Sequence, residues 1–289
     1  MSSSNVSKKP LRIPPWLRVK LPDGESYGCT EGLIDDLNLN TVCQSAKCPN
    51  KWECFSHNVA TFLIMGRVCT RTCVFCNIAP GQVAPIEPDE PSRVAEAARR
   101  LNLKHCVVTS VTRDDLPDGG AAHFAATVNV VRDASPGCTV EVLIPDFQGD
   151  EAALMTVLDA RPDVLNHNLE TVPRLYDAIR PQADYRQSLE LLTRAKRLAP
   201  TTPAKSGLMV GLGETDDEIL SVLDDLAAVS CDIVTIGQYM QPTKAHPRVV
   251  RYVEPSIFEM YSEEGKKRGI RRMFSAPLVR SSYHAGQFV

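Results

Sequence analysis

Residues 61–76 read Thr61-Phe-Leu-Ile-Met-Gly-Arg-Val-Cys-Thr-Arg-Thr-Cys-Val-Phe-Cys76, a short apolar run followed at once by a loop with three cysteines. The run at 61–65 has the length and the β-rich composition of a buried strand. Similar runs recur along the chain with helical stretches between them. This alternation is typical of parallel βα units, so we predict an α/β domain that begins near residue 59.

Working outward from this stretch, the pattern predicts five more strands and a possible seventh. The runs lie at residues 105–111, 139–144, 164–169, 206–212 and 232–239, with the extra run at 273–275. Helical spacing of apolar residues predicts helices at 92–102 and 185–198, and Thr215 to Glu218 reads as a capping box that opens another helix. Six such units predict a partial TIM-type (β/α)6 barrel.

The first 58 residues do not share this rhythm. Residues 1–22 contain four prolines and predict an extended arm, residues 30–42 a possible short helix, and residues 43–54 a polar loop. We therefore expect three parts: an N-terminal extension at 1–58 with a cysteine loop, the barrel at 59–270, and a C-terminal segment at 271–289 that closes over the cysteine loop of the extension.

Composition limits the classes of function. The chain has 289 residues, 43% of them hydrophobic, which predicts a globular protein with a substantial core. No apolar run reaches the length of a membrane span, and a net charge of -3 argues against general nucleic-acid binding, although five basic residues precede the first acid. We expect neither membrane nor nucleic acid as a partner.

Six of the ten cysteines fall between Cys43 and Cys76, without the hydrophobic leader that a secreted disulfide protein would show. This arrangement favours a reducing compartment, and we expect a cytoplasmic location of the bacterial type. An organelle matrix is the less favoured alternative, because prolines interrupt the amphipathic helix that a transit peptide forms.

The first cysteine group, Cys69, Cys73 and Cys76, has C-x3-C-x2-C spacing and is called the barrel triplet below. Three thiolates in one loop can hold three irons of a cubane cluster and leave the fourth iron open for an exogenous ligand. Zinc is the alternative, but structural zinc prefers four protein ligands. Because βα barrels place active sites at the ends of their strands, the position of the loop favours the cluster.

The second group, Cys43, Cys48 and Cys54, has C-x4-C-x5-C spacing and is called the upstream triplet. Two incomplete sets on one chain predict two sites that each take a further ligand from elsewhere. The alternative merges the cysteines into one or two zinc sites with the help of His57.

Several other residues have two interpretations each. Asn166, His167 and Glu170 follow a predicted strand, where ligands bind, although His167 also fits a buried core. Gly211 and Gly213 either allow close approach of a cofactor or simply form a turn. The aspartates 114, 115 and 118 suggest a hard-metal site or a solvated loop, and the basic residues between 266 and 272 suggest a solvated face or a patch for an acidic partner.

The cysteine loop resembles that of the radical S-adenosylmethionine (SAM) enzymes, and the upstream triplet together with Arg280-Ser-Ser-Tyr-His284 resembles the lipoyl synthase family. The resemblance extends over nearly the whole chain. It includes the segments 9–16, 60–64, 113–120, 143–147, 166–173, 211–215 and 277–282, with no departure at any of them.

The resemblance implies two 4Fe-4S clusters and S-adenosyl-L-methionine. The barrel triplet would bind the cluster whose open iron chelates SAM, and one electron would cleave SAM to a 5′-deoxyadenosyl radical. Asn166, Glu170, Gly211 and Gly213 are the candidate contacts to SAM. The upstream triplet would bind an auxiliary cluster, the sulfur source, with Ser281 as its fourth ligand and Arg280 as a possible stabiliser of the serine alkoxide.

The implied reaction inserts sulfur at C6 and C8 of an octanoyl chain on a lysine of a lipoyl carrier domain. The implied carriers are the E2 subunit of a 2-oxoacid dehydrogenase or the glycine cleavage H protein. A flavodoxin- or ferredoxin-type electron donor and an iron-sulfur carrier that rebuilds the consumed cluster are further implied partners. Alternatives are another sulfur-inserting radical SAM enzyme, resembling biotin synthase or a methylthiotransferase, and a non-enzymatic zinc or iron-sulfur scaffold.

Overall fold

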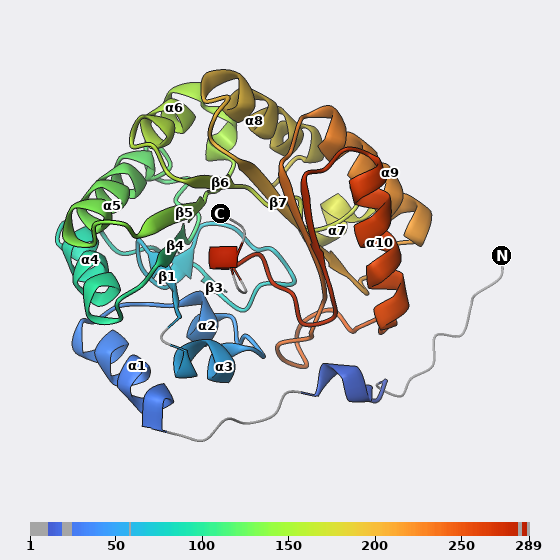
Figure 1. Cartoon of the computed structure of the whole chain (residues 1–289), viewed down its shortest axis with the longest axis horizontal. Helices are drawn as coiled ribbons and strands as arrows, with labels where there is room; N and C mark the ends of the chain where they lie inside the picture. The colour runs from blue at the N-terminus through green and yellow to red at the C-terminus, as the bar shows by residue number, and fades with distance from the viewer. Residues whose placement is uncertain (1–10, 19–24, 58, 283–284, 288–289) are drawn as a thin grey trace.

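The computed structural model describes residues 11–18, 25–57, 59–282 and 285–287. Its centre is a seven-stranded parallel sheet in the order β1-β4-β5-β6-β7-β8-β9. Figure 1 shows the sheet curled into an open ring with the helices outside it. The strands are β1 (Thr61–Ile64), β4 (His105–Ser110), β5 (Thr139–Leu143), β6 (Val164–Asn166), β7 (Ala204–Val210), β8 (Ile233–Gln238) and β9 (Arg272–Ser275).

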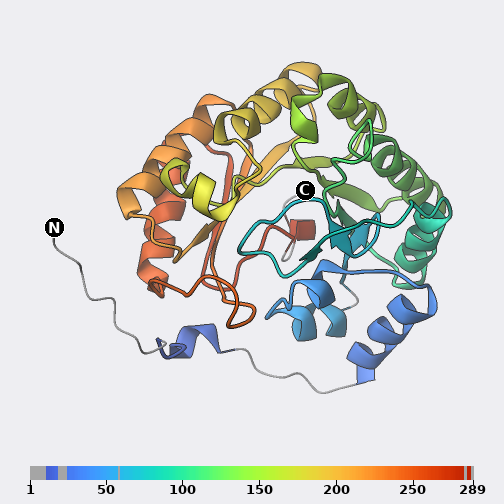
Figure 2. The same cartoon turned by 180° about the vertical axis from the view of Figure 1, so that it is seen from behind.

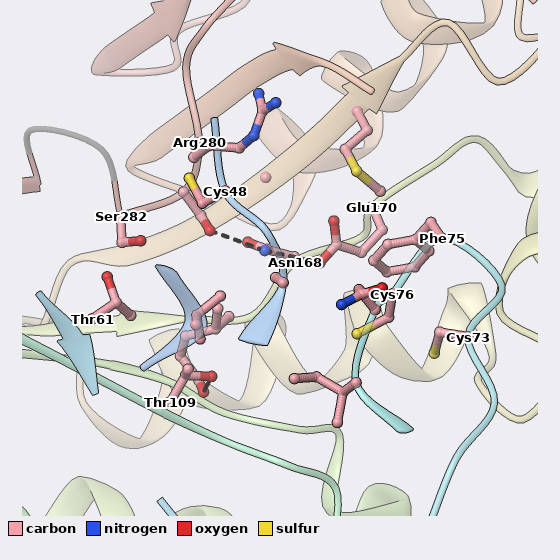
Figure 3. A pocket seen from close by; sticks show the side chains of 18 of the residues that line it. Cys48, Thr61, Cys73, Phe75, Cys76, Thr109, Asn168, Glu170, Arg280 and Ser282 are labelled. Atoms are coloured by element: carbon pink, nitrogen blue, oxygen red, sulfur yellow. Dashed lines mark hydrogen bonds between the residues drawn. The ribbon is translucent and has the colours of Figure 1, made fainter. Parts of the chain in front are cut away.

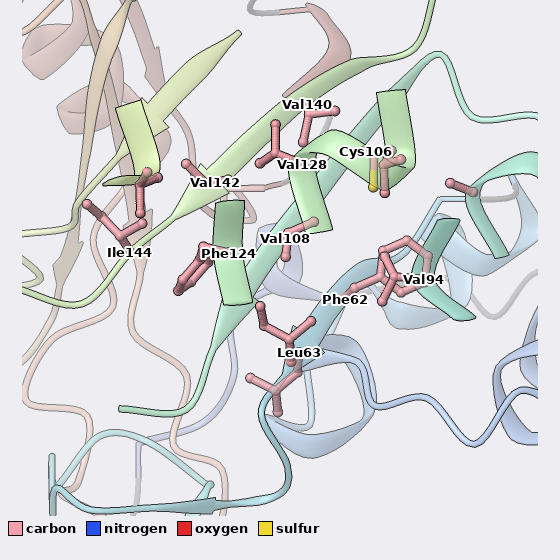
Figure 4. Close-up of a cluster of buried hydrophobic side chains, with 14 of the residues drawn as sticks. Phe62, Leu63, Val94, Cys106, Val108, Phe124, Val128, Val140, Val142 and Ile144 are labelled. Carbon is pink, nitrogen blue, oxygen red and sulfur yellow. The ribbon is translucent and has the colours of Figure 1, made fainter. Parts of the chain in front are cut away.

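The helices between the strands pack their apolar faces on the outside of this ring. In the half shown in Figure 4, Val94 and Phe124 from two helices meet Cys106, Val108 and other outward-facing strand residues. The helices are α4 (Glu90–Arg100), α5 (Ala121–Ala134), α6 (Glu151–Asp159), α7 (Tyr176–Ile179), α8 (Tyr185–Leu198), α9 (Asp216–Ala228) and α10 (Pro255–Lys267), with the short turns η2 (Phe147–Gly149) and η3 (Pro173–Leu175).

The predicted partial barrel is confirmed, including the six expected strands and the possible extra run, which is β9. The helix predicted at 185–198 is α8, and the capping box is present: the Thr215 hydroxyl accepts from the Glu218 amide, and the Glu218 carboxylate accepts from the Thr215 amide. Because β9 pairs with β8, the sheet continues into the segment that we assigned to the C-terminal part. The division into three parts stays a prediction.

The N-terminal extension covers the opening of the ring. It forms η1 (Pro15–Leu17), α1 (Glu25–Asp36), α2 (Val42–Ser45) and α3 (Lys51–Ser56). The prediction of a polar loop at 43–54 is therefore wrong, since two short helices occupy most of it. Thr41 bridges Phe62 of the edge strand β1, and the Asn40 carbonyl accepts from the Leu63 amide. These contacts cover an edge that would otherwise expose unpaired backbone groups.

The end of the chain returns to the centre of the ring. The turn η4 (Ala285–Gln287) lies inside it in both Figure 1 and Figure 2, and Ala285 is buried among Val107, Val164 and Ile233. Within the described ranges, no helix is long and apolar enough to cross a bilayer. The arm predicted at 1–22 falls largely outside the described residues, and its described part includes η1 with Leu17 buried.

Candidate functional site

A cavity of about 490 Å³ lies at the carboxyl ends of the strands, and five of the six cysteines of the two triplets border it. All three members of the barrel triplet line it from one side. Cys43 and Cys48 line it from another, as do Ser281 and Ser282 of the C-terminal segment. In Figure 3, Cys73 and Cys76 stand across the site from Cys48, Arg280 and Ser282. Segments more than 200 residues apart therefore meet at one cavity.

Backbone contacts fix the loop of the barrel triplet. Cys69 ends β2 (Val68–Cys69), which pairs with β3 (Ala79–Pro80) to close the base of the loop. The amides of Arg71 and Thr112 point at the Cys69 sulfur, at 3.4 and 3.3 Å. The far end is held by His246, whose Nε2 donates to the Cys76 carbonyl at 3.1 Å. Contacts within the protein therefore restrain both ends of the loop.

The thiols of this loop also affect one another. Burial, together with the nearby Cys73 and Cys69 sulfurs, raises the pKa of Cys76 to about 12. Burial likewise raises the pKa of Cys73, while Arg180 opposes the shift. Buried thiols that must become thiolates are stabilised when a metal neutralises them, so this donor set suits a metal cluster.

The upstream triplet is distributed over two short helices. Cys43 lies in α2, whose N-cap residue, Thr41, accepts a hydrogen bond from the Gln44 amide. Cys54 lies in α3. Burial raises the pKa of Cys43 to about 11, and the Cys48 thiol adds to the shift. Burial, followed by Cys43 and Cys48, also raises the pKa of Cys54. Although Cys54 is not among the cavity-lining residues, it therefore lies close enough to the other two thiols to interact with them.

The C-terminal segment 276–282 brings Ser281 to this place. It leaves β9 and is held to β8, because the Ala276 amide donates to the Ile236 carbonyl and the Gln238 amide donates to the Pro277 carbonyl. Gly237 allows the close approach, since a Cβ there would lie 1.9 Å from the Val279 carbonyl oxygen. The Ser281 hydroxyl then accepts a 3.3 Å hydrogen bond from Asn168.

Four polar residues that follow β6 line the wall between the two triplets. Asn168 donates to the Glu170 carboxylate at 3.0 Å, and Figure 3 shows these two residues side by side. Asn168 also donates to Ser281. Burial raises the pKa of Glu170, although Arg180 and Asn168 oppose it. Arg180 donates from Nη1 to the carbonyls of Asn168 and Leu169 and so fixes this turn. The Glu170 backbone has a φ of +69°, a conformation that residues other than glycine rarely adopt.

His167 completes this wall and is neutral. Its Nδ1 donates to the Ile144 carbonyl at 2.9 Å, because a carbonyl can only accept. Burial and, to a smaller extent, the Arg180 charge together lower the pKa of His167 to about 4. The buried atoms His167 Nε2, Asn168 Oδ1 and Arg180 Nε have no hydrogen-bond partner in the described part of the chain. Since buried polar atoms are normally paired, these atoms fit a polar ligand in the cavity.

The structure places the four candidate SAM contacts differently, and their role as contacts stays a prediction. Glu170 lines the cavity, but Asn166, Gly211 and Gly213 do not. Asn166 is completely buried and donates to Glu141, one inward-facing position deeper in the barrel than Asn168. Gly211 serves the turn after β7: its φ is +103°, and a Cβ would lie 2.2 Å from the Gln238 side-chain nitrogen.

The three aspartates do not form a metal site, and they lie in a partly exposed loop in which Asp115 is exposed. Asp114 pairs with Arg71 and Asp115 with Arg113, while Asp118 accepts from two backbone amides at the start of α5. The basic group at 266–272 lies at the end of α10 and the start of β9, so it is at the opposite edge of the sheet from the cavity. Lys267 and Arg268 pair there with Glu264 and Asp224, which argues against the patch for an acidic partner.

Sequence reasoning missed three residues of the site. Arg71, inside the barrel-triplet loop, pairs with both Asp114 and Asp146, and Arg180 and Asn168 shape the wall after β6. The period of two along a strand would have pointed to Asn168, because it shares the inward face with Asn166. Arg180 carried no such signal, since it follows a short helix and reaches back to the strand end.

No three His, Cys, Asp or Glu side chains among the described residues converge on one point as a single metal ion would require. A cubane cluster requires a different arrangement, because each thiolate binds a separate iron at a different corner of the cluster. Two groups of three mutually interacting thiols at one cavity, with unpaired polar atoms between them, fit two clusters and a polar cofactor.

Comparisons with known proteins agree with this geometry. Residues 63–226 match the family model of the radical SAM superfamily, and residues 2–48 match that of the N-terminal domain of lipoyl synthase. A lipoyl synthase of Oleidesulfovibrio alaskensis is 65% identical over 289 residues, covering 100% of this chain and 99% of that protein. One of Caldanaerobacter subterraneus is 55% identical over 275 residues, covering 95% and 96%.

Solved structures show the same fold at low identity. A crystal structure of methylornithine synthase has a TM-score of 0.57 at 15% identity and covers 85% of this chain and 74% of that one. Streptococcus suis SuiB, crystallised with S-adenosylmethionine, has a TM-score of 0.58 at 9% identity and covers 78% and 54%. From the identity over its full length and the two family models, this chain belongs to the lipoyl synthase family of the radical SAM superfamily.

Proposed function

We propose that this enzyme inserts two sulfur atoms, at C6 and C8, into an octanoyl chain carried on a lysine of a lipoyl carrier domain. The observation that carries the proposal is the placement of two cysteine triplets on one cavity of about 490 Å³. A carbon radical made at one side and a sulfur source at the other must reach the same carbon atoms. One shared cavity provides that proximity.

The barrel triplet would hold the 4Fe-4S cluster that a radical SAM enzyme requires, and the upstream triplet with Ser281 would hold the auxiliary one. When bound, the first supplies reductive cleavage of SAM and the second supplies sulfur. The unpaired atoms of His167, Asn168 and Arg180 support a polar cofactor between them. Glu170 lies on the same wall and would accept hydrogen bonds from it.

The chain's own residues prepare the site in three ways. The backbone amides of Arg71 and Thr112 are directed at the Cys69 sulfur and restrain its position, and His246 holds the far end of the loop. The Asn168 side-chain amide donates to the Ser281 oxygen, and this hydrogen bond would stabilise the alkoxide form of the serine. Arg280 lines the cavity beside them; burial lowers its pKa, while Cys48 and Glu170 oppose the shift and favour its charged form.

The carriers in this proposal are the E2 subunit of a 2-oxoacid dehydrogenase or the glycine cleavage H protein. A flavodoxin- or ferredoxin-type donor would supply electrons, and an iron-sulfur carrier would rebuild the auxiliary cluster. A cytoplasmic location fits the bacterial relatives and the reduced thiols that the clusters need.

The test is anaerobic reconstitution followed by mass spectrometry with an octanoylated lysine peptide and SAM. We expect a product that gains two sulfur atoms, together with 5′-deoxyadenosine. Cleavage of SAM without any sulfur in the peptide would favour a different radical SAM reaction. Stoichiometric zinc with less than about one iron per chain would favour the scaffold.

A further inference from the structure

Asn50 lies inside the upstream triplet, between Cys48 and Cys54, at the N-cap position of α3. Asparagine usually accepts a hydrogen bond from the helix backbone at this position. Here the side chain makes no such cap. Instead its Nδ2 donates to the Leu278 carbonyl at 2.7 Å, although the two residues are 228 positions apart. Asn50 is only 1% exposed, so the donor of this partly buried bond is shielded from solvent.

The acceptor belongs to the segment 276–282, three residues before Ser281. Contacts to β8 hold the first part of this segment on the barrel side, and Asn50 holds it on the side of the upstream triplet. The amide orientation is determined by chemistry, because Asn50 Oδ1 facing the Leu278 carbonyl would place two acceptors together. That Oδ1 atom is buried and has no partner among the described residues, a cost that stays uncompensated at this site.

We propose that Asn50 is a positioning residue that holds the Ser281 segment against the upstream triplet. The inference rests on the proposed function, in which the Ser281 oxygen completes the auxiliary site. The triplet and the serine come from opposite ends of the chain, and Asn50 supplies a direct hydrogen bond between their two segments. Without it, Ser281 would keep its 3.3 Å contact with Asn168 but lose this restraint toward the cysteines.

The decisive variant is Asn50→Asp, which has nearly the same shape but places a carboxylate against the Leu278 carbonyl. Asn50→Ser is the second variant, because serine caps α3 and is too short to replace the bond. The matched control is Asn77→Asp. Asn77 also donates from Nδ2 to a backbone carbonyl at 2.7 Å, but its acceptor, Ser45, lies outside the segment 276–282.

The first measurement is hydrogen exchange on the full, anaerobically reconstituted chain. Loss of one buried hydrogen bond should make backbone amides of residues 276–282 exchange about twofold to tenfold faster in both Asn50 variants. The Asn77 variant should leave that segment at the wild-type rate. Unchanged exchange in Asn50→Ser, with the protein folded, would overturn the proposal whatever the enzyme produces.

The second measurement is spectroscopic and tests whether Asn50 acts through Ser281. In a chain whose barrel triplet is replaced by alanine, Mössbauer spectra report the auxiliary cluster alone. We expect Asn50→Asp to change the unique iron site in the same way as Ser281→Ala, and the double variant to show no further change. An additional change in the double variant would assign Asn50 a general structural role.

Failure of the proposed function remains distinguishable from failure of this inference. If the wild-type chain makes no thiolated peptide, the function is wrong, yet the exchange experiment still decides whether Asn50 holds the segment. If the wild type makes product, Asn50→Ser should lower the thiolated product per 5′-deoxyadenosine at least fivefold. A wild-type ratio in that variant would contradict the positioning role.

Discussion

Replacement of Arg71 by alanine should destabilise the cluster-free chain more than loss of any surface ion pair. The guanidinium makes four charge-assisted hydrogen bonds, two to Asp114 and two to Asp146, all between 2.7 and 2.9 Å. The Asp146 side chain has no exposed surface, and that of Arg71 is 6% exposed. Because the variant leaves buried carboxylates without a counter-charge, we expect a loss of about 3–5 kcal/mol in the free energy of unfolding.

The assay is urea or thermal denaturation, where this loss corresponds to roughly 6–15 °C in melting temperature. The control is Arg197→Ala, which removes a 2.6 Å pair with Glu151 whose side chains are 58% and 44% exposed, and should cost less than about 1 kcal/mol. Arg71→Lys should fall between, since an ammonium cannot bind two carboxylates bidentately. If Arg71→Ala melts like Arg197→Ala, the reasoning is refuted.

The pH dependence gives the sign of the same effect. Burial alone would raise the pKa of Asp146, but hydrogen bonds from Arg71 outweigh it and lower the pKa below 3.8. The stabilisation is therefore present above about pH 4 and is lost as the pH falls through the lower folded-state pKa. In Arg71→Ala, the Gln148 amide still opposes the effect of burial but Arg71 no longer does, so Asp146 takes up a proton at higher pH. The stability gap between the two proteins should narrow as the pH falls from 7 toward 4.

Three further predictions concern the site. Alanine at all three positions of the barrel triplet should abolish 5′-deoxyadenosine formation. The same change in the upstream triplet should leave 5′-deoxyadenosine formation intact but eliminate the thiolated product. If the upstream variant still makes thiolated product, the auxiliary cluster is not the sulfur donor. Ser281→Ala should cleave SAM without inserting sulfur, while Ser282→Ala should insert it, and the reverse result would move the ligand by one residue. Burial lowers the pKa of His167 to about 4, so its contribution to stability is complete above pH 6.5 and falls between pH 6.5 and 4; urea midpoints of His167→Gln should depend less on pH over that range.

Some features were predictable because they repeat locally. Each strand of the barrel is an apolar run of its own, so residues 61–65 and 139–144 could be identified without knowledge of their neighbours. The capping box at Thr215 involves contacts only three residues apart. The cysteine triplets are likewise compact in sequence, and their spacing already indicated three ligands per site.

The helices around Cys43 and Cys54 were missed for a physical reason. They are four and six residues long, too short for an apolar period, and they form because Thr41 caps one of them and the edge of β1 supports the segment. That Asn166 and Gly211 lie outside the cavity lining could not be predicted for a related reason. The depth of an inward-facing side chain in the barrel depends on how the neighbouring strands are staggered. The sequence of a single strand does not contain this information.

The sequence by itself therefore determined the parallel α/β barrel, the two cysteine triplets and, through resemblance, the family. Only the tertiary structure decided that both triplets face one cavity, that Asn168 contacts Ser281, and that Asn50 joins the two ends of the chain. The last two are contacts between residues more than 100 positions apart. They arise when the ring of strands closes on the terminal segments, and hydrophobic period and local capping describe each element without specifying that closure.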